Sequence, residues 1–264
     1  MLPREFVKKH KIKLNKAETK LCRDAVRMMS KSLDVYHDES HVYRMLDYLD
    51  EFMATKEYKK KAPDINIKAL FIAILWHDTW KAGRDPKNVL EVIPDIIFEG
   101  LACARKFQKA ARIAGLDIDI ARKVKYMIRK HSLVQILPIA TAEAKILSDM
   151  DDLDVFSLDR LYLLEKKYSC DRPFNRPTLY LAKFGMNIVF KKKVENNFFF
   201  HWSKKESREK KKIFIKKAQG GIDAYEECLN FLEKGNELEF ERYRGEWVAE
   251  NITRPEREGR EDLF

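Results

Sequence analysis

Residues 69–78 read ALFIAILWHD and contain the longest strongly apolar run of the chain. The eight residues from Ala69 to Trp76 are apolar without interruption, a pattern shared by buried strands and buried helices. The length of the run and the absence of a flanking glycine favour a helix. His77 and Asp78 then place an imidazole and a carboxylate at the end of the most apolar segment of the chain.

The position of these two polar residues is energetically unfavourable in a bare protein. A carboxylate at a helix C-terminus faces the negative end of the helix dipole, which costs about 0.3–1 kcal/mol, and burial adds to that cost. A bound divalent cation would reverse the sign of the interaction. The His77-Asp78 pair therefore indicates a metal site, provided that further ligands lie nearby in the fold.

Apolar residues recur at helical spacing on both sides of this run. The expected helices span residues 15–33, 40–53, 65–80, 94–114, 118–131 and 141–160, with Asn15 suited to cap the first and Gly115 between the fourth and the fifth. Nine glycines and eight prolines are few for 264 residues, which favours long helices over hairpins. We therefore expect an all-α protein.

Composition excludes several classes of protein. The longest strongly apolar run has eight residues, whereas a membrane-spanning helix needs roughly 20. Charged residues stand where a signal peptide would be apolar, and the four cysteines lie far apart without a C-x-x-C pair. We expect a reduced, cytoplasmic protein without a membrane partner, and the sequence predicts no particular oligomeric state.

The chain divides by composition into three parts. We expect a helical domain over residues 15–170, a basic and aromatic-rich helical extension over 171–236, and a polar tail over 237–264. Between Lys191 and Lys217 there are eleven Lys or Arg and three Glu, interleaved with Phe198, Phe199, Phe200 and Trp202. This extension could bind nucleic acid by charge and stacking, but a solvated helix whose aromatic residues pack on the core is the favoured interpretation.

The net charge of +10 has two interpretations. A positive field suits a phosphate-bearing partner, such as a nucleotide or a nucleic acid, because it raises the local concentration of anions. Excess lysine can equally serve to keep a protein soluble. Charge alone therefore names no substrate.

Two further residues are candidate ligands by helical phase. At about 100° per residue, His41 projects on the apolar side of the helix expected at 40–53. In the acidic cluster at residues 149–154, Asp149 falls inside the apolar stripe, whereas Asp151, Asp152 and Asp154 are expected at the surface. A carboxylate within an apolar face must be paired, protonated or bound to a metal.

Two imidazoles and two carboxylates, from His41, His77, Asp78 and Asp149, form a mixed nitrogen and oxygen site. Such a site suits Mn, Fe, Co, Ni, Zn or Mg, so the divalent metal ion is not identified by its ligands.

At this point three segments resemble the HD superfamily of metal-dependent phosphohydrolases. Residues 36–41 (YHDESH) are similar to the first HD motif, residues 77–81 (HDTWK) resemble the family's His-Asp-x-x-Lys, and residues 148–151 (SDMD) resemble its last motif, in which the first Asp is the ligand. The resemblance covers about residues 20–160 and implies an HD-domain-like helical bundle with His41, His77, Asp78 and Asp149 as metal ligands.

The resemblance also implies roles for residues around the metal. Lys81 would contact a substrate phosphate, and His37 would donate a proton to the leaving group, although a solvent-exposed His37 is an equal alternative. Glu99 stands where related hydrolases carry a glutamate that orients the attacking water. His131 ends the apolar stripe of the helix expected at 118–131 and could bind phosphate or a second metal, or be a core histidine.

The implied activity is hydrolysis of a phosphate ester, most simply of a nucleotide, by metal-activated water. The alternatives are a phosphodiesterase or nuclease acting on a cyclic nucleotide or oligonucleotide, and a non-catalytic nucleic-acid-binding module with a structural metal. Some HD proteins are di-iron oxygenases with two further histidines between the His-Asp pair and the last Asp. Only His131 lies in that interval here, which disfavours the oxygenase.

Overall fold

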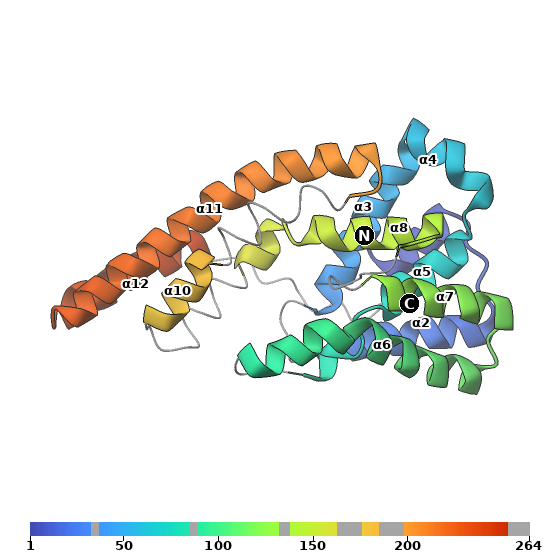
Figure 1. The fold of residues 1–264 in the computed structure, drawn as a ribbon, viewed down its shortest axis with the longest axis horizontal. Coiled ribbons are helices and arrows are strands. Elements are labelled where there is room, and N and C mark those ends of the chain that lie inside the picture. The colour runs from blue at the N-terminus through green and yellow to red at the C-terminus, as the bar shows by residue number, and fades with distance from the viewer. Residues whose placement is uncertain (33–36, 85–88, 132–137, 163–175, 185–197, 253–264) are drawn as a thin grey trace. The chain divides into compact units, whose positions relative to one another are not determined.

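A computed structural model of the chain describes residues 1–264 except 33–36, 85–88, 132–137, 163–175, 185–197 and 253–264 (Figure 1). Helices account for the regular structure throughout the described part, which contains no strand. The expected all-α class is confirmed. Contacts divide the chain into two compact units, the first made of Met1–Asp154 with Phe199–Ser203 and the second including Val155–Phe198 and Lys204–Gly259.

Helix α5 (Ile67–Trp76) lies at the centre of the first unit, so the apolar run is a helix and not a strand. The side chain of Asn66 caps it by accepting a hydrogen bond from the Ala69 backbone N–H, and every residue from Ala69 to Trp76 is buried. Four helices pack against α5, namely α2 (Lys16–Met29), α3 (Glu39–Ala54), α7 (Ile118–Lys130) and α8 (Ala142–Asp154). A helix buried on all sides explains why no charged residue lies between Lys68 and His77.

Local signals set several helix ends as expected. Asn15 and Glu18 form a reciprocal capping box at the start of α2. Gly115 adopts a φ of 66° between α6 (Val89–Ala114) and α7, a conformation that costs glycine little. Helix α8 ends at Asp154 instead of residue 160, because Ser157 Oγ accepts a hydrogen bond from the Asp159 N–H and begins a new turn.

Two short helices of the first unit were not expected. Helix α1 (Pro3–Lys9) precedes the predicted domain, and α4 (Lys56–Lys61) occupies a lysine-rich stretch that resembles a linker. The Thr55 side chain caps α4 by accepting from the Tyr58 N–H. The 3-10 turns η1 (Ala62–Asp64) and η2 (Lys81–Gly83) flank α5 in sequence.

The second unit contains α10 (Arg176–Phe184) and most of the 33-residue helix α11 (His201–Glu233). Helix α12 (Glu237–Ile252) follows Gly235, so the expected polar tail is helical as far as residue 252. The division between the units falls at Asp154, earlier than the expected boundary at residue 170. In the described ranges no helix has both the length and the apolar character needed to cross a bilayer.

Candidate metal site

His41 enters the site from the first turn of α3. Asp38 caps this helix by accepting from the Ser40 and His41 backbone N–H groups, which fixes where the helix begins. The His41 ring is fully buried, and its Nδ1 lies 2.7 Å from Asp154 Oδ2. Its other nitrogen, Nε2, faces the end of α5.

His77 and Asp78 follow directly after Trp76, the last residue of α5. His77 Nδ1 lies 2.7 Å from the Ile74 carbonyl oxygen. A carbonyl oxygen can only accept, so Nδ1 carries the proton and Nε2 of the neutral ring presents a lone pair. Both residues are buried, with Asp78 only 1% exposed.

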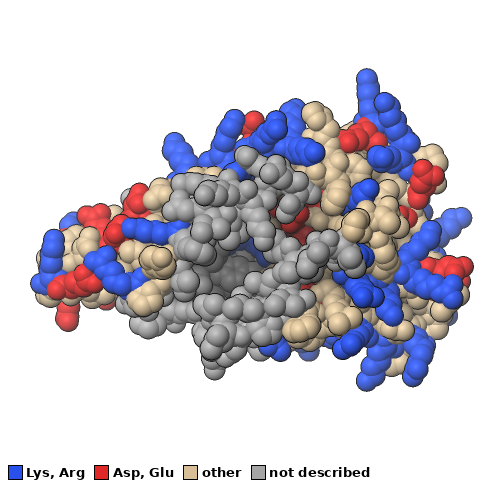
Figure 2. Space-filling model, in the orientation of Figure 1, with Lys and Arg blue, Asp and Glu red and all other residues tan. Residues whose placement is uncertain are grey.

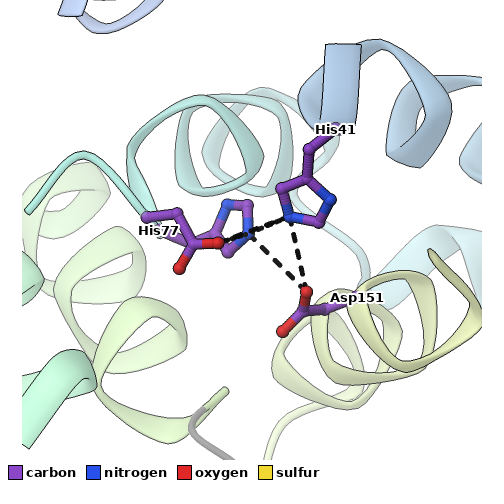
Figure 3. A group of neighbouring side chains, drawn as sticks. His41, His77 and Asp151 are labelled. Carbon is purple, nitrogen blue, oxygen red and sulfur yellow. Dashed lines mark hydrogen bonds and ion pairs between the residues drawn. The ribbon is translucent and has the colours of Figure 1, made fainter. Parts of the chain in front are cut away.

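Four potential ligand atoms converge at this point: Nε2 of His41, Nε2 of His77, Oδ2 of Asp78 and Oδ1 of Asp151, all within 4.8 Å of one another (Figure 3). His41 Nε2 lies 3.0 Å from His77 Nε2 and 3.4 Å from each of the two carboxylate oxygens. His77 Nε2 lies 3.3 Å from Asp78 and 3.9 Å from Asp151. Ligands about 2.1 Å from one tetrahedral ion are about 3.4 Å apart, so these spacings fit a single divalent ion.

The environment of Asp78 also favours a cation. Burial alone would raise the pKa of Asp78, but the neighbouring His77, Lys81 and His37 hold that pKa well below its usual range. Its Oδ1 is buried and accepts no hydrogen bond from the described residues, with His131 Nε2 at 3.5 Å. A buried, charged oxygen without a donor is costly, and a metal ion would satisfy it.

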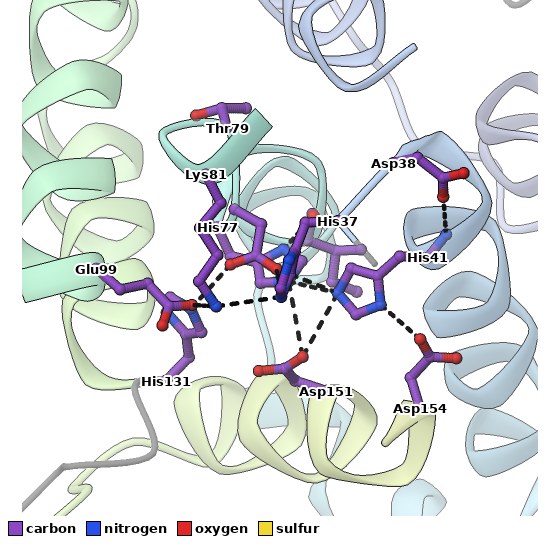
Figure 4. Close-up of polar contacts among 12 residues, drawn as sticks. His37, Asp38, His41, His77, Thr79, Lys81, Glu99, His131, Asp151 and Asp154 are labelled. Carbon is purple, nitrogen blue, oxygen red and sulfur yellow. Dashed lines mark hydrogen bonds and ion pairs between the residues drawn. The ribbon is translucent and has the colours of Figure 1, made fainter. Parts of the chain in front are cut away.

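A second group of possible ligands shares Asp78 and adds Glu99 and His131 (Figure 4). His131 Nδ1 contacts the Ile128 carbonyl oxygen, and Nε2 lies 3.2 Å from Glu99 Oε1. Burial opposes protonation of His131, yet the neighbouring carboxylates of Asp78 and Glu99 raise its pKa well above the ordinary value. The carboxylates of Asp78 and Glu99 and the imidazole of His131 could hold a second metal ion. Alternatively, they could share a proton at this position.

Close packing of α6 on α7 brings Glu99 and His131 together. A Cβ atom added to Gly100 would lie 2.9 Å from the Arg129 carbonyl oxygen, so only glycine allows this approach. Glu99 and His131, which were expected to be site residues, therefore lie beside the metal ligands although they are far apart in sequence.

Lys81 and His37 complete the cluster. Lys81 Nζ lies 2.7 Å from Glu99 Oε1 and donates to His37 Nε2 at 3.1 Å. Burial would lower the pKa of Lys81, but Asp78 and Glu99 raise that pKa well above its ordinary value, so the side chain remains a cation. His37 is partly buried and lies 3.6 Å from Asp78 Oδ2, which excludes the alternative of a histidine free in solvent.

The location of Asp149 differs from the prediction. It is fully buried, as expected, but its two oxygens accept hydrogen bonds from the Phe199 and Phe200 backbone N–H groups at 2.9 and 3.0 Å. Burial raises the pKa of Asp149 to about 7, against the effect of these hydrogen bonds. Asp149 thus anchors the start of α11 and does not join the ligand group.

Asp151, and not Asp149, is the fourth residue of the ligand group. Helical phase failed here because α8 is buried on several sides: α3, α5 and α7 pack against it, and Phe199–Ser203 contributes a further neighbour through Asp149. An Asp-x-Asp pair spans about 200°, so its members meet different neighbours. The expectation of a surface position was wrong for Asp154, which is fully buried, and Asp152 is half-buried.

No role was expected for Arg44, and Asp154 was expected at the surface. Arg44 Nε and Nη2 donate to both oxygens of Asp154, at 2.6 and 2.9 Å, and Asp154 in turn contacts His41. The available signal was the spacing of His41 and Arg44, which places them on the same side of one helix.

Comparison of the chain with protein-family models, with curated proteins and with solved structures found no significant match. The chemistry of the buried group is therefore the basis for inferring what the protein does: it could bind a metal ion.

Proposed function

We propose that the protein is a metal-dependent phosphohydrolase that cleaves a phosphate ester, most simply that of a nucleotide. The observation that carries this proposal is the convergence of His41, His77, Asp78 and Asp151 on one buried point next to a lysine. A divalent ion bound there would lower the pKa of a coordinated water and polarise a phosphoryl oxygen.

The neighbouring side chains suit a phosphate substrate. Lys81 is a partly buried cation whose charge would oppose the negative charge that develops on the phosphoryl oxygens. His37 Nε2 accepts a hydrogen bond from Lys81 and so presents a lone pair. If that nitrogen takes up a proton, the ring could deliver it to a leaving oxygen. Glu99 and His131 form a second proton-holding pair on the side of Lys81.

The choice of substrate class rests on the HD resemblance of residues 36–41, 77–81 and 148–151 and on the net charge of +10. Asp151, which takes the place of Asp149 in the ligand group, belongs to the same SDMD segment, so the resemblance still applies. A cyclic nucleotide or an oligonucleotide offers the same phosphate chemistry and is the alternative substrate.

The test is phosphate release from nucleoside mono-, di- and triphosphates and from an aryl phosphate, and conversion of a cyclic nucleotide to its monophosphate, in the presence of Mn²⁺, Co²⁺, Ni²⁺ or Mg²⁺. Asp78→Ala should abolish activity, whereas Asp119→Asn, at an exposed carboxylate on α7, should leave it unchanged. Absence of turnover with every metal, or full activity in Asp78→Ala, would refute the proposal.

A second candidate is nucleic-acid binding through α11. Five basic side chains are exposed within about 120° of one face, over about 18 Å of helix. They are Lys204, Lys205, Arg208, Lys212 and Lys216. Figure 2 shows Lys and Arg side chains along the edge where Figure 1 places α11.

The aromatic residues favour backbone contacts over base stacking in this candidate. The rings of Phe200 and Trp202 lie 4.9 and 5.5 Å from that of Phe52, so these two pack on the core, whereas Phe199 is exposed. Binding to a labelled duplex should weaken with salt, and changing three of the five basic residues to Glu should reduce the log–log salt slope by about 0.9 per lost contact. An unchanged slope would exclude this candidate.

A further inference from the structure

A buried ion pair lies directly behind the metal-ligand group. Arg44 on α3 donates two hydrogen bonds to Asp154, the last residue of α8, and Asp154 also contacts His41 Nδ1 at 2.7 Å. Asp154 is fully buried and Arg44 is only 8% exposed. Arg44 Nη1 also donates to Ser40 Oγ, whose hydroxyl donates to Asp38, the cap of α3.

The protonation of His41 follows from these contacts. Arg44 is always protonated and can only donate, so Asp154 must supply acceptors and is held as a carboxylate. An ionised carboxylate has no proton to give, and the proton between Asp154 and His41 must therefore reside on Nδ1 of the ring. The other nitrogen, Nε2, is then left with its lone pair in the neutral ring.

We propose that Asp154 and Arg44 are a positioning pair that fixes the tautomer and the orientation of His41, and thereby sets the metal affinity of the site. This inference rests on the metal-binding part of the proposed function. Without the pair, the proton of a neutral His41 could move to Nε2, which could then no longer bind a metal. Outer-shell partners of ligating histidines commonly change metal affinity about 10- to 100-fold.

Arg44 fixes the orientation of the Asp154 carboxylate. Its two-point contact prevents Asp154 from rotating, because a rotation would break at least one hydrogen bond of a buried charge pair. Helix α3 supplies both His41 and Arg44, one turn apart, so the imidazole and the guanidinium are held by the same helix. Asp154, on α8, contacts both side chains and so links the Arg44 guanidinium to the His41 ring.

The chain offers a matched control for this pair. Asp50, also on α3, contacts His10 Nε2 at 2.9 Å and Lys9 Nζ at 2.7 Å, so it repeats the arrangement of a carboxylate with a histidine and a cation. None of these three residues belongs to the ligand group. Asp50→Asn therefore breaks an equivalent pair without touching the metal site.

The experiment combines Co²⁺ titration, followed by its visible absorption, with ¹⁵N NMR of the histidine rings. In the wild-type protein Nδ1 of His41 should be protonated with and without metal. Asp154→Asn, whose amide offers a donor as well as an acceptor, should weaken Co²⁺ binding about 10- to 100-fold. Asp50→Asn should leave the affinity within about twofold of wild type.

Arg44→Lys keeps the buried positive charge and provides a milder variant, with a smaller loss of affinity, if Asp154→Asn does not fold. An unprotonated Nδ1 in the wild type, or unchanged Co²⁺ affinity in a folded Asp154→Asn or Arg44→Lys variant, would overturn the positioning role alone. A wild-type protein that binds no divalent ion would overturn the proposed function, and the positioning role with it.

Discussion

The exchange of roles between Asp149 and Asp151 is the sharpest prediction of the structure. We expect Asp151→Asn to remove metal-dependent stabilisation and Asp149→Asn to leave it intact, because only Asp151 faces the two imidazoles. The two substitutions are identical in chemistry and only two residues apart on α8. A general effect of lost charge on this helix would affect both variants alike.

The magnitudes follow from linkage. A metal ion at 100 times its Kd stabilises the folded state by about 2.7 kcal/mol, which corresponds to a rise in Tm of about 5–11 °C for a domain of this size. Loss of a direct ligand should weaken binding about 100-fold or more, since outer-shell changes alone reach that value. At the same metal concentration only about 0.4 kcal/mol would remain, a shift of about 1–2 °C.

Asp149→Asn should act on the metal-free protein instead. Its amide can accept from one of the Phe199 and Phe200 N–H groups but not from both, which leaves a buried donor unpaired at a cost of about 1–3 kcal/mol. The assay is thermal unfolding by circular dichroism with and without Co²⁺, with Asp119→Asn as the control. A metal-induced shift that is lost in Asp149→Asn and kept in Asp151→Asn would refute the assignment.

Three further predictions test the surroundings of the site. Gly100→Ala should destabilise the protein by about 1–3 kcal/mol in urea unfolding, because its Cβ would lie 2.9 Å from a backbone oxygen of α7, whereas Gly83→Ala has open space and should be close to neutral. Glu57→Gln should speed hydrogen exchange of the Trp202 amide, which now donates to that carboxylate at 3.0 Å, and unchanged exchange would contradict the contact. Lys81→Met should bind Co²⁺ more tightly, since a competing cation is removed, yet lower kcat about 100-fold or more, and tighter binding without this loss would exclude its role in turnover.

Local sequence signals predicted the fold well. The capping box at Asn15, the glycine break at Gly115 and the length of the apolar run are each decided by neighbouring residues, and each is found where expected. Helix α12 was missed because its residues are mostly polar, so no apolar stripe marked residues 237–252 as helical.

The site was predicted in part, for a physical reason. His41, His77 and Asp78 were identifiable because a polar group in an apolar stretch needs a partner, whichever helix supplies it. The choice between Asp149 and Asp151 depends on which neighbours surround α8, and the segment that binds Asp149 lies 50 residues further along the chain. No pattern within α8 contains that information.

The acidic residues of α8 differ in the positive or donor groups that surround them. Asp149 is compensated by two backbone N–H groups, and Asp154 by Arg44 and the Nδ1–H of His41. Asp151 instead faces the Nε2 atoms of two histidines whose protons reside on their other nitrogens. Lys81 is shared by Asp78, Glu99 and, with the smallest effect, Asp151. A protonated imidazole or a bound ion would add positive charge beside Asp151, and the four ligand atoms are spaced so that they could hold an ion.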